Sequence, residues 1–401
     1  MRFVPLSIYI HIPFCTSRCA YCDFNTYAGL DGLIPAYAGA VGLELQQVGR
    51  SLQDAGEDPG VHTVFFGGGT PSLLPAASME SILNALRTSF DVDEESEITL
   101  EANPGSLGRQ DLLRLRRAGV NRLSIGAQSA DPNELRLLER SHSFADVAAA
   151  VGLARRAGFH NLSLDLIYGL PRQPLPLWLD TLERAVALGP EHLSLYALSL
   201  EHGTPLRAWV ERGLVELPDP DLAAEMYEAA CARLEQQGFV QYEISNWARD
   251  DGRAGDGDLP RFASRHNVQY WRNRPYLGIG AGAHGFVFGW RYSNVLSPAA
   301  YIDRIRAGGS TALPCSPAVA QRIPVAPAVE MDETMMLGFR LTREGIRPSY
   351  FRARFGLEAE GRYGPRLRQL EADGLIERRA DALRLTPRGR LLGNRVFQAF
   401  I

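Results

Sequence analysis

Short runs of apolar and β-branched residues recur along the first half of the chain, and each is followed by a stretch whose apolar residues have helical spacing. The runs predict strands at Ser7–Ile12, His62–Phe66, Ile98–Glu101, Arg122–Gly126, Leu162–Ile167 and Leu193–Ala197. The helical spacing predicts helices at Ala36–Leu52, Met79–Ser89, Asp111–Ala118, Phe144–Ala157, Leu177–Ala187 and Asp221–Gln237. Strand and helix therefore alternate along this part of the chain.

This alternation predicts the fold class. Strands joined by helical crossovers form parallel sheets, and right-handed crossovers curl such a sheet toward a barrel. A closed barrel of this type has eight strand–helix units, whereas the pattern here supplies six. We therefore predict an α/β fold, a partial (β/α)6 barrel of the TIM type.

The pattern changes toward the C-terminus. Residues 248–265, rich in Asp, Gly and Arg, predict a surface loop, and the proline-rich residues 310–327 predict a linker after a barrel domain at 1–309. Residues 328–401 show helical spacing, then two strand-like runs about a turn at Ala380–Asp381, then a last helical stretch. This order predicts a mostly helical, winged-helix-like C-terminal domain.

Composition narrows the classes of protein. Of 401 residues, 45% are hydrophobic and 22% are charged, which is enough to bury a large core. The formal net charge of −4 argues against broad electrostatic binding to nucleic acid or to a membrane. No apolar run predicts a membrane span, and the N-terminus is unlike a signal peptide. An odd number of cysteines, mostly clustered, does not fit a secreted disulfide framework, so we expect a cytoplasmic protein.

The clustered cysteines, Cys15, Cys19 and Cys22, have C-x3-C-x2-C spacing directly after the first expected strand. Parallel barrels carry their chemistry at this end of the strands. Three thiolates can hold three irons of a 4Fe–4S cluster, which usually has four cysteine ligands. The open iron could then be chelated by an aminocarboxylate such as that of S-adenosylmethionine (SAM). With Tyr21 before the last cysteine, the spacing is similar to the signature of the radical SAM superfamily.

Two other interpretations of these cysteines remain open. A zinc site would normally recruit a fourth Cys or His, and His11 is close in sequence, although it lies on the expected strand. Inert buried cysteines are the second alternative. Cys231 lies on an expected helix and is most simply a core residue, and Cys315, in the proline-rich stretch, has no visible partner.

Glycines and polar residues follow the later strands. Residues 66–71 read FGGGTP, and three glycines expose backbone N–H and C=O groups to a ligand, although a tight turn would explain them as well. Glu101 ends the third expected strand, Gln128 follows the fourth and Asp165 lies within the fifth. A carboxylate in such an apolar run is costly to bury without a partner. Several polar groups at one end of successive strands favour a bound ligand, and SAM offers ribose hydroxyls and a sulfonium charge.

Over nearly its whole length the chain resembles the oxygen-independent coproporphyrinogen III oxidase family and, within it, the HemW-type heme chaperones. The segments that carry this resemblance are YIHIPFCTSRCAYCDF, FFGGGTPSLL, EANP, RLSIGAQS, LERSH, LDLIYGLP, YEISNWA and HNVQYW. The resemblance implies that Cys15, Cys19 and Cys22 bind the cluster, and that the barrel domain carries a family-specific extension. It implies SAM contacts from Tyr9, Gly68, Gly69, Thr70, Glu101, Gln128, Arg140 and Asp165.

Three features favour the chaperone branch of this family. Phe24 stands where the oxidases carry an additional cysteine, and the stretch before Cys15 is shorter than their N-terminal segment. His266–Trp271 match the HNxxYW motif of the chaperones, which is associated with heme binding. The His266 imidazole could ligate heme iron and the aromatic rings could stack on a porphyrin, although a hydrogen-bonded structural histidine explains the same residues. His142 also matches the family, but a helix cap explains it equally well.

The function implied by the resemblance is a heme chaperone that holds a 4Fe–4S cluster and SAM, binds heme and transfers it to an acceptor hemoprotein. The resemblance also implies peripheral contact with membrane-bound respiratory enzymes. The alternative is an active coproporphyrinogen oxidase, in which radicals derived from SAM start the decarboxylation of two propionates. The C-terminal domain mixes both charge signs, so we expect it to bind a protein and not nucleic acid.

Overall fold

The computed structural model describes residues 5–57, 60–252, 258–309 and 316–401, which fold into two compact units. The first unit comprises Met1–Glu191, Leu195–Met226 and Pro275–Pro324. The second comprises His192–Ser194, Tyr227–Arg274 and Val325–Ile401. Residues 310–315 of the predicted linker lie outside the described residues, and the predicted boundaries at 310 and 327 stay predictions.

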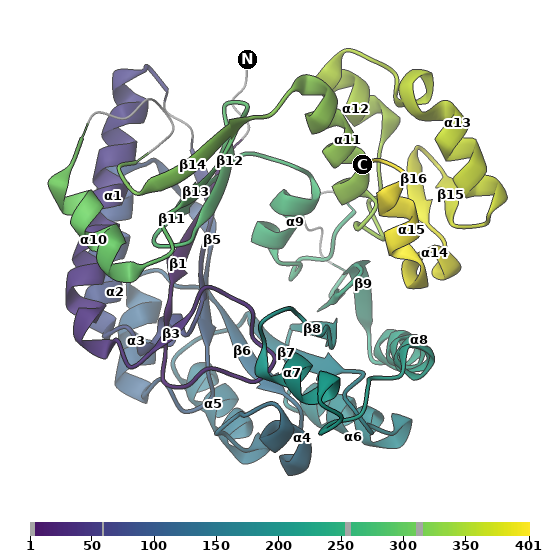
Figure 1. Cartoon of the computed structure of the whole chain (residues 1–401), viewed down its shortest axis with the longest axis horizontal. Helices are drawn as coiled ribbons and strands as arrows, with labels where there is room; N and C mark the ends of the chain where they lie inside the picture. Colours follow the sequence, from purple (N-terminus) through teal and green to yellow (C-terminus); the bar gives the residue numbers. More distant parts are fainter. Residues whose placement is uncertain (1–4, 58–59, 253–257, 310–315) are drawn as a thin grey trace. The chain divides into compact units, whose positions relative to one another are not determined.

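The first unit is built on a largely parallel sheet (Figure 1). The six predicted strands are β1 (Leu6–Ile12), β4 (Val61–Gly68), β5 (Val92–Ala102), β6 (Arg122–Gln128), β7 (Leu162–Tyr168) and β8 (His192–Ala197). They lie side by side in chain order, and the pairs from β1 to β7 are parallel. Consecutive residues, which point to opposite faces, are buried together, such as Ser7 and Ile8 on β1 and Thr99 and Leu100 on β5, as expected of a parallel sheet covered on both sides. The predicted α/β fold is therefore confirmed.

Helices cover the outer side of this sheet (Figure 1). They are α1 (Ile34–Asp54), α2 (Ala76–Ser89), α3 (Arg109–Arg117), α4 (Pro132–Leu137), α5 (Phe144–Arg156) and α6 (Leu175–Ala187). After β8 the chain forms α7 (Pro205–Glu211) and α8 (Pro220–Gln236), and from Tyr227 onward α8 belongs to the second unit. The cap of α5 is Ser143, whose hydroxyl accepts from the Asp146 N–H while the Asp146 carboxylate accepts in return. His142 is therefore not the cap. Its Nε2 lies 3.0 Å from the Ala127 carbonyl oxygen.

Four further strands extend the sheet beyond β1, and the sequence patterns do not predict them. β11 (Tyr276–Ile279) pairs parallel to β1, and β12 (His284–Val287), β13 (Trp290–Asn294) and β14 (Val319–Pro324) continue as an antiparallel meander. Helix α10 (Pro298–Ala307) comes between β13 and β14. β14 falls within the stretch predicted as a linker.

A buried carboxyl group joins this extension to the first helix. Glu44 of α1 is 1% exposed. Its carboxyl oxygens accept hydrogen bonds from the Gly280 N–H (2.8 Å), Asn294 Nδ2 (3.1 Å), the Tyr301 hydroxyl (2.6 Å) and the Ser316 hydroxyl (2.5 Å). Burial raises the pKa of Glu44 above its usual value. Four donors satisfy a group that would otherwise be costly to bury.

The second unit combines a small hairpin with the C-terminal helices. β9 (Phe239–Glu243) and β10 (Asn246–Arg249) pair antiparallel, and β10 also pairs with His192–Ser194 of β8. The remaining elements are α9 (Arg265–Trp271), α11 (Pro327–Gly338), α12 (Pro348–Phe355), α13 (Ala359–Ala372), β15 (Ile376–Arg379), β16 (Ala382–Leu385), α14 (Pro387–Leu391) and α15 (Gly393–Gln398). The sequence of helix, two-stranded wing and helix agrees with the predicted winged-helix-like order.

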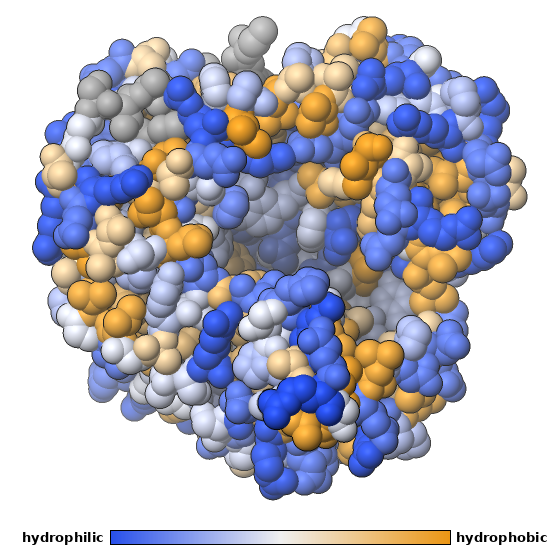
Figure 2. Space-filling model, viewed as in Figure 1, coloured by the Kyte–Doolittle hydropathy of each residue, from blue (hydrophilic) through white to orange (hydrophobic). Residues whose placement is uncertain are grey.

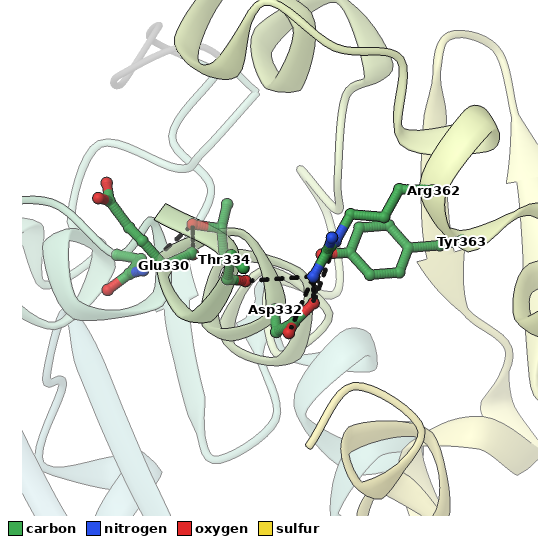
Figure 3. Close-up of polar contacts among 7 residues, drawn as sticks. Glu330, Asp332, Thr334, Arg362 and Tyr363 are labelled. Carbon is green, nitrogen blue, oxygen red and sulfur yellow. Dashed lines mark hydrogen bonds and ion pairs between the residues drawn. The ribbon is translucent and has the colours of Figure 1, made fainter. Parts of the chain in front are cut away.

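An acidic side chain connects two of these helices (Figure 3). Asp332 of α11 accepts from the Tyr363 hydroxyl at 2.6 Å and from Arg362 Nη2 at 3.0 Å, both on α13. The Tyr363 hydroxyl in turn accepts from Arg362 Nε at 2.9 Å. Beneath this group lies an apolar core that includes Phe339, Phe351 and Phe400. Helix packing and polar contacts therefore support the C-terminal domain together.

Within the described residues, no helix is both long enough and apolar enough to cross a membrane. Figure 2 shows hydrophilic residues over much of the face in view, with hydrophobic residues interspersed.

Candidate cofactor site

A cavity of about 410 Å³ opens in the first unit where the parallel strands end. The structure brings together at this cavity all the predicted site residues except Tyr9 and His266. Those lining it are Cys15, Cys19, Cys22, Gly68, Gly69, Thr70, Glu101, Gln128, Arg140 and Asp165. The carboxyl ends of parallel strands meet at one edge, which is why residues far apart in the sequence converge there.

The three cysteines lie on one partly exposed loop after β1. Cys15 belongs to the two-residue strand β2 (Phe14–Cys15), which pairs with β3 (Tyr27–Ala28). The Cys22 N–H donates to the Cys19 carbonyl at 3.2 Å, and Arg18 Nη2 donates to the Cys22 carbonyl at 3.1 Å. Burial raises the pKa of the Cys15 and Cys22 thiols, so metal binding must displace their protons.

Three thiolates on one loop are the donor set that a 4Fe–4S cluster with one open iron needs. In the described part of the chain, no group of three or more His, Cys, Asp or Glu is arranged to hold one metal ion. His11 does not supply a fourth zinc ligand, because its Nε2 lies 3.0 Å from the Asn25 carbonyl and its Nδ1 2.9 Å from the Tyr9 hydroxyl.

Glycines let the end of β4 lie against the cysteine loop. Gly68 has φ of +111°, and a Cβ there would meet the His11 ring at 2.4 Å. A Cβ on Gly69 would meet the Phe14 carbonyl at 2.6 Å and Cys15 Sγ at 3.0 Å. Backbone hydrogen bonds from Gly69 to Ile12 and from Thr70 to Phe14, both 2.8 Å, hold this close approach. The glycine run is therefore a structural requirement of the site, beyond a tight turn.

A chain of hydrogen bonds links two of the thiols through a residue that the sequence analysis did not single out. Arg140 Nη1 donates to Cys19 Sγ at 3.5 Å, and its Nη2 donates to Asn103 Oδ1 at 2.6 Å. Asn103 Nδ2 donates to Thr70 Oγ1 at 3.0 Å, and the Thr70 hydroxyl donates to Cys15 Sγ at 3.7 Å. Asn103 follows Glu101 in the EANP segment, and its place just past β5 is the signal that could have identified it.

Two carboxyl groups face the cavity from β5 and β7, the strands on either side of β6. Glu101 Oε2 accepts from the Gly68 N–H at 3.1 Å, and burial together with the nearby Asp165 raises the pKa of Glu101 to about 8. Both Asp165 oxygens accept from the Ser124 hydroxyl at 3.0 Å. A ligand with a positive charge or with hydroxyl donors would satisfy this pair and favour its ionised form.

Backbone strain marks the end of β6. Gln128 has φ of 63°, unusual for a residue with a side chain, and the β6–β7 register shifts between Gly126 and Gln128. A Cβ on Gly126 would meet Gln128 Nε2 at 2.8 Å and Arg140 Nη2 at 3.2 Å. Gly126 thus leaves room at the cavity for two predicted ligand-binding side chains, Gln128 and Arg140.

Comparison with known proteins places this site in a family. Residues 9–208 match the Radical SAM superfamily, and residues 325–392 match the HemN C-terminal domain. The heme chaperone HemW of Bacillus subtilis (strain 168) is 37% identical over 399 residues, which cover 98% of this chain and 99% of that protein. The heme chaperone HemW of Lactococcus lactis is 34% identical over 99% of this chain and 97% of its own length. The chain belongs to the HemW family.

The fold of this HemW family member also matches a solved structure. Coproporphyrinogen III oxidase (HemN) from Escherichia coli, described as a radical SAM enzyme, aligns with a TM-score of 0.81 at 24% identity, over 99% of this chain and 90% of that one. The match confirms the predicted radical SAM fold with its C-terminal domain. The predicted family is confirmed as well.

Two predicted residues of the HemW family pattern do not line the cavity. Tyr9 lies on β1, where its ring stacks on Phe65 and its hydroxyl contacts His11. His266 belongs to the second unit, on α9, and is 1% exposed. Its Nε2 lies 3.0 Å from the Tyr270 hydroxyl, one turn along the same helix. Ligation of heme iron by His266 stays a prediction, and it would require this hydrogen bond to open.

Cys231 and Cys315 are not part of the cysteine loop. Cys231 is partly exposed on α8 and lines a second cavity, so it is not a simple core residue. Burial raises the pKa of its thiol to about 11. Cys315 lies outside the described residues.

Proposed function

We propose that this protein is a heme chaperone, which binds heme and delivers it to an acceptor hemoprotein in the cytoplasm or at the cytoplasmic side of a respiratory membrane complex. The observation that carries the proposal is the full-length relationship to heme chaperones HemW, at 34% and 37% identity. The exposed Phe24, at the position where the resembling oxidases carry a further cysteine, agrees with it.

The cofactors of the proposed chaperone are a 4Fe–4S cluster and SAM. Cys15, Cys19 and Cys22 would hold the cluster, and Arg140 and Thr70 would donate hydrogen bonds to its thiolates. When bound, cluster and SAM together supply one-electron chemistry. The protein's own part is to orient SAM and to exclude water.

The proposed SAM contacts follow from the groups at the cavity. Gly68 and Gly69 line the cavity at the end of β4, and Glu101 and Asp165 offer acceptors for an ammonium group and for ribose hydroxyls. Tyr9, Gln128 and Arg140 complete the set implied by the family pattern.

Heme binding is proposed for the second unit, where α9 carries His266, Tyr270 and Trp271. The imidazole would serve as the iron ligand once the hydrogen bond to Tyr270 opens, since a neutral ring nitrogen is a common axial ligand. Heme and an acceptor hemoprotein are the proposed partners.

The test follows heme leaving the reconstituted protein under anaerobic conditions. The protein is loaded with heme and mixed with increasing amounts of an apo-cytochrome b, with apomyoglobin as a passive heme trap. Direct transfer gives a rate that rises with the cytochrome concentration, while the rate to apomyoglobin stays at the dissociation rate. Equal, concentration-independent rates to both proteins would contradict the proposal.

The oxidase alternative has a direct assay of its own. The same protein is incubated with coproporphyrinogen III, SAM and a reductant. The proposal expects no protoporphyrinogen, and its accumulation at a catalytic rate would replace the chaperone assignment with the oxidase.

A further inference from the structure

A second cavity, of about 500 Å³, lies wholly within the second unit and contains no residue of the predicted cofactor site. It is lined by the C-terminal part of α8, by β9 and β10, by the segment after α11, by the β15–β16 hairpin and by α14 (Figure 1). Four of its lining residues are arginines from separate segments: Arg343, Arg379, Arg384 and Arg390. We call this cavity the arginine pocket.

The arginine pocket has an excess of positive charge. Glu235 is the one acidic residue that lines it, against four arginines, whereas the whole chain carries a formal net charge of −4. Burial raises the pKa of the Cys231 thiol, which also lines the pocket, to about 11, so this group adds no negative charge at pH 7. A concave site with an excess of one charge attracts ligands of the opposite charge.

Two of the arginines have no acidic partner. Among the described residues, Arg379 and Arg390 form no ion pair. Arg390 donates from Nη1 to Oε1 of the neutral Gln241 at 2.9 Å, and its Nε is buried without a hydrogen-bond partner. Because a guanidinium group has five N–H donors, Arg390 keeps donors for a ligand.

The other two arginines are only loosely neutralised. Arg343 Nη1 lies 3.6 Å from Asp250 Oδ2, and Arg384 Nη2 lies 3.8 Å from Asp258 Oδ2. Both distances exceed the length of about 2.7–2.9 Å that is typical of a charge-assisted hydrogen bond. Asp258 makes a closer contact with Arg347, outside the pocket. These guanidinium groups therefore also keep capacity for an external anion.

The arginines of the pocket are more accessible than its aromatic residues. Phe239 and Trp247 belong to the lining but are only 2% and 1% exposed. Arg379 is exposed, and Arg343 and Arg390 are half-buried. A ligand would therefore meet guanidinium groups and not aromatic rings, which suits a compact polar anion better than a flat apolar molecule.

A fixed amide holds Arg390 in place. Gln241 Nε2 donates to the Tyr227 hydroxyl at 2.6 Å and to the Ile244 carbonyl at 2.9 Å, which leaves Oε1 to accept from Arg390. The Thr342 hydroxyl donates to the Gln241 carbonyl at 3.1 Å. A side chain that is held before the ligand arrives loses less entropy on binding.

Arginines beside the pocket, in contrast to those in it, are closely paired with acidic residues. Arg378, which precedes Arg379 on β15, donates to Glu371 Oε1 at 2.6 Å and to Glu360 Oε2 at 2.8 Å. Arg368 lies 3.3 Å from Glu360. These pairs interrupt the basic surface beside the pocket, whereas nucleic acid is bound by a continuous one. The surroundings therefore favour a single anionic group over a long polyanion.

The number of arginines indicates the class of anion. A carboxylate has two oxygens in one plane, and one guanidinium satisfies it in a bidentate pair. A phosphate monoester carries a charge of about −1.5 to −2 at pH 7 and has three strong acceptor oxygens that point in different directions. Four guanidinium groups from separate segments match the second arrangement, and the cavity leaves room for a substituent on the phosphate.

We infer that the arginine pocket binds the phosphate group of a small phosphate ester. The proposed heme binding assigns no role to this pocket, and the two functions do not depend on each other. Arg379 and Arg390, which have no acidic partner, are the residues expected to contribute most to the affinity.

The experiment is a calorimetric titration of the full-length reconstituted protein at constant ionic strength. The probes are glycerol 3-phosphate, inorganic phosphate and the dicarboxylate succinate. The pocket variants are Arg390→Gln and Arg379→Gln, the latter at an exposed position where folding should not be disturbed. The matched control is Arg378→Gln, which removes the same charge from the neighbouring residue. Successive residues of a strand point to opposite sides, and Arg378 does not line the pocket.

Wild-type protein is expected to bind one glycerol 3-phosphate per chain, at least about tenfold more tightly than succinate. Inorganic phosphate should bind at the same site more weakly than the ester. Arg390→Gln should weaken binding of the ester about tenfold and Arg379→Gln severalfold, because each removes a charged donor. Arg378→Gln should stay within about twofold of the wild type.

Four results would overturn the inference. Absence of saturable binding of glycerol 3-phosphate to the wild type would exclude the ligand class. Equal binding of succinate would make the pocket a general anion site. Binding of the ester that survives in both pocket variants would place the phosphate site elsewhere. Finally, duplex DNA or phosphatidylglycerol vesicles that bind in an Arg379-dependent way, in protein that does not bind glycerol 3-phosphate, would assign the pocket to a polyanion.

Discussion

Two of the three thiols of the cysteine loop are contacted by side chains that reach them from other parts of the fold. Thr70 and Arg140 approach Cys15 and Cys19, and Asn103 hydrogen-bonds to both of these donors. The cysteines could be predicted from their spacing. Asn103 could not, because its role depends on the meeting of strand ends that are remote in the sequence.

Asn103→Ala tests this hydrogen-bonded chain. The substitution leaves the three cysteines in place, so the cluster should still assemble. Hydrogen bonds to cluster sulfurs raise the reduction potential, and loss of the support for Thr70 and Arg140 should therefore lower it. A redox titration followed by EPR measures the change, with Asn133→Ala, on exposed α4 surface, as the control. An unchanged potential would show that Asn103 does not order the two donors.

Glu101 gives a pH-dependent prediction for the protein without cluster or SAM. Its pKa is raised from an ordinary value near 4.5 to about 8, so the folded protein holds a proton that the unfolded chain releases between these values. The stabilisation that comes from this bound proton is present below about pH 4.5. It is lost as the pH rises through about 8. Urea unfolding at several pH values should show that Glu101→Gln becomes more stable relative to the wild type as the pH increases. A difference that stays constant with pH would contradict the raised pKa.

At the level of elements, the six strands from β1 to β8 that alternate with helices could be predicted because they are largely buried on both faces, which leaves apolar runs in the sequence. The strands β11 to β14 lack this signal. β11 is four residues long and contains Gly278, and five residues of β14 are exposed. The prediction of a surface loop at 248–265 was also only partly right, because Leu259 and Ala263 are buried in a small apolar cluster. These features depend on tertiary pairing that no local pattern encodes.

Glu44 is the clearest test of how the added strands are attached. Glu44→Ala leaves four buried donors without an acceptor, and we expect it to lower the free energy of unfolding by about 3 kcal/mol or more. Urea unfolding measures the loss. The matched control is Gln46→Ala, an exposed position on the same helix, which should change the stability by less than about 0.5 kcal/mol. Equal effects of the two substitutions would contradict the role of Glu44.

On the scale of the whole molecule, the two compact units carry different chemistry. The first holds the cysteine loop and the strand-end cavity, and the second holds α9 with His266. The sequence predicted the C-terminal domain. It did not predict that residues 227–274 fold with that domain, because this association joins segments separated by about fifty residues of β11–β14.

Deletion of residues 328–401 tests this division. The cluster should still assemble in the first unit, as shown by iron and sulfide content and by EPR of the reduced protein. Residues 227–274 lose the apolar cover of Leu341 and should become sensitive to limited proteolysis. Heme transfer should be abolished. Loss of the cluster would instead make the C-terminal domain necessary for the fold of the first unit.

The central claim is that a radical SAM scaffold here serves to bind heme. The most direct measurement is a heme titration of the anaerobically reconstituted protein, followed by Soret absorbance. We expect saturable binding of one heme per chain, in protein whose cluster remains intact, with weaker binding in His266→Ala. A titration without saturation, together with formation of protoporphyrinogen from coproporphyrinogen III, would contradict it.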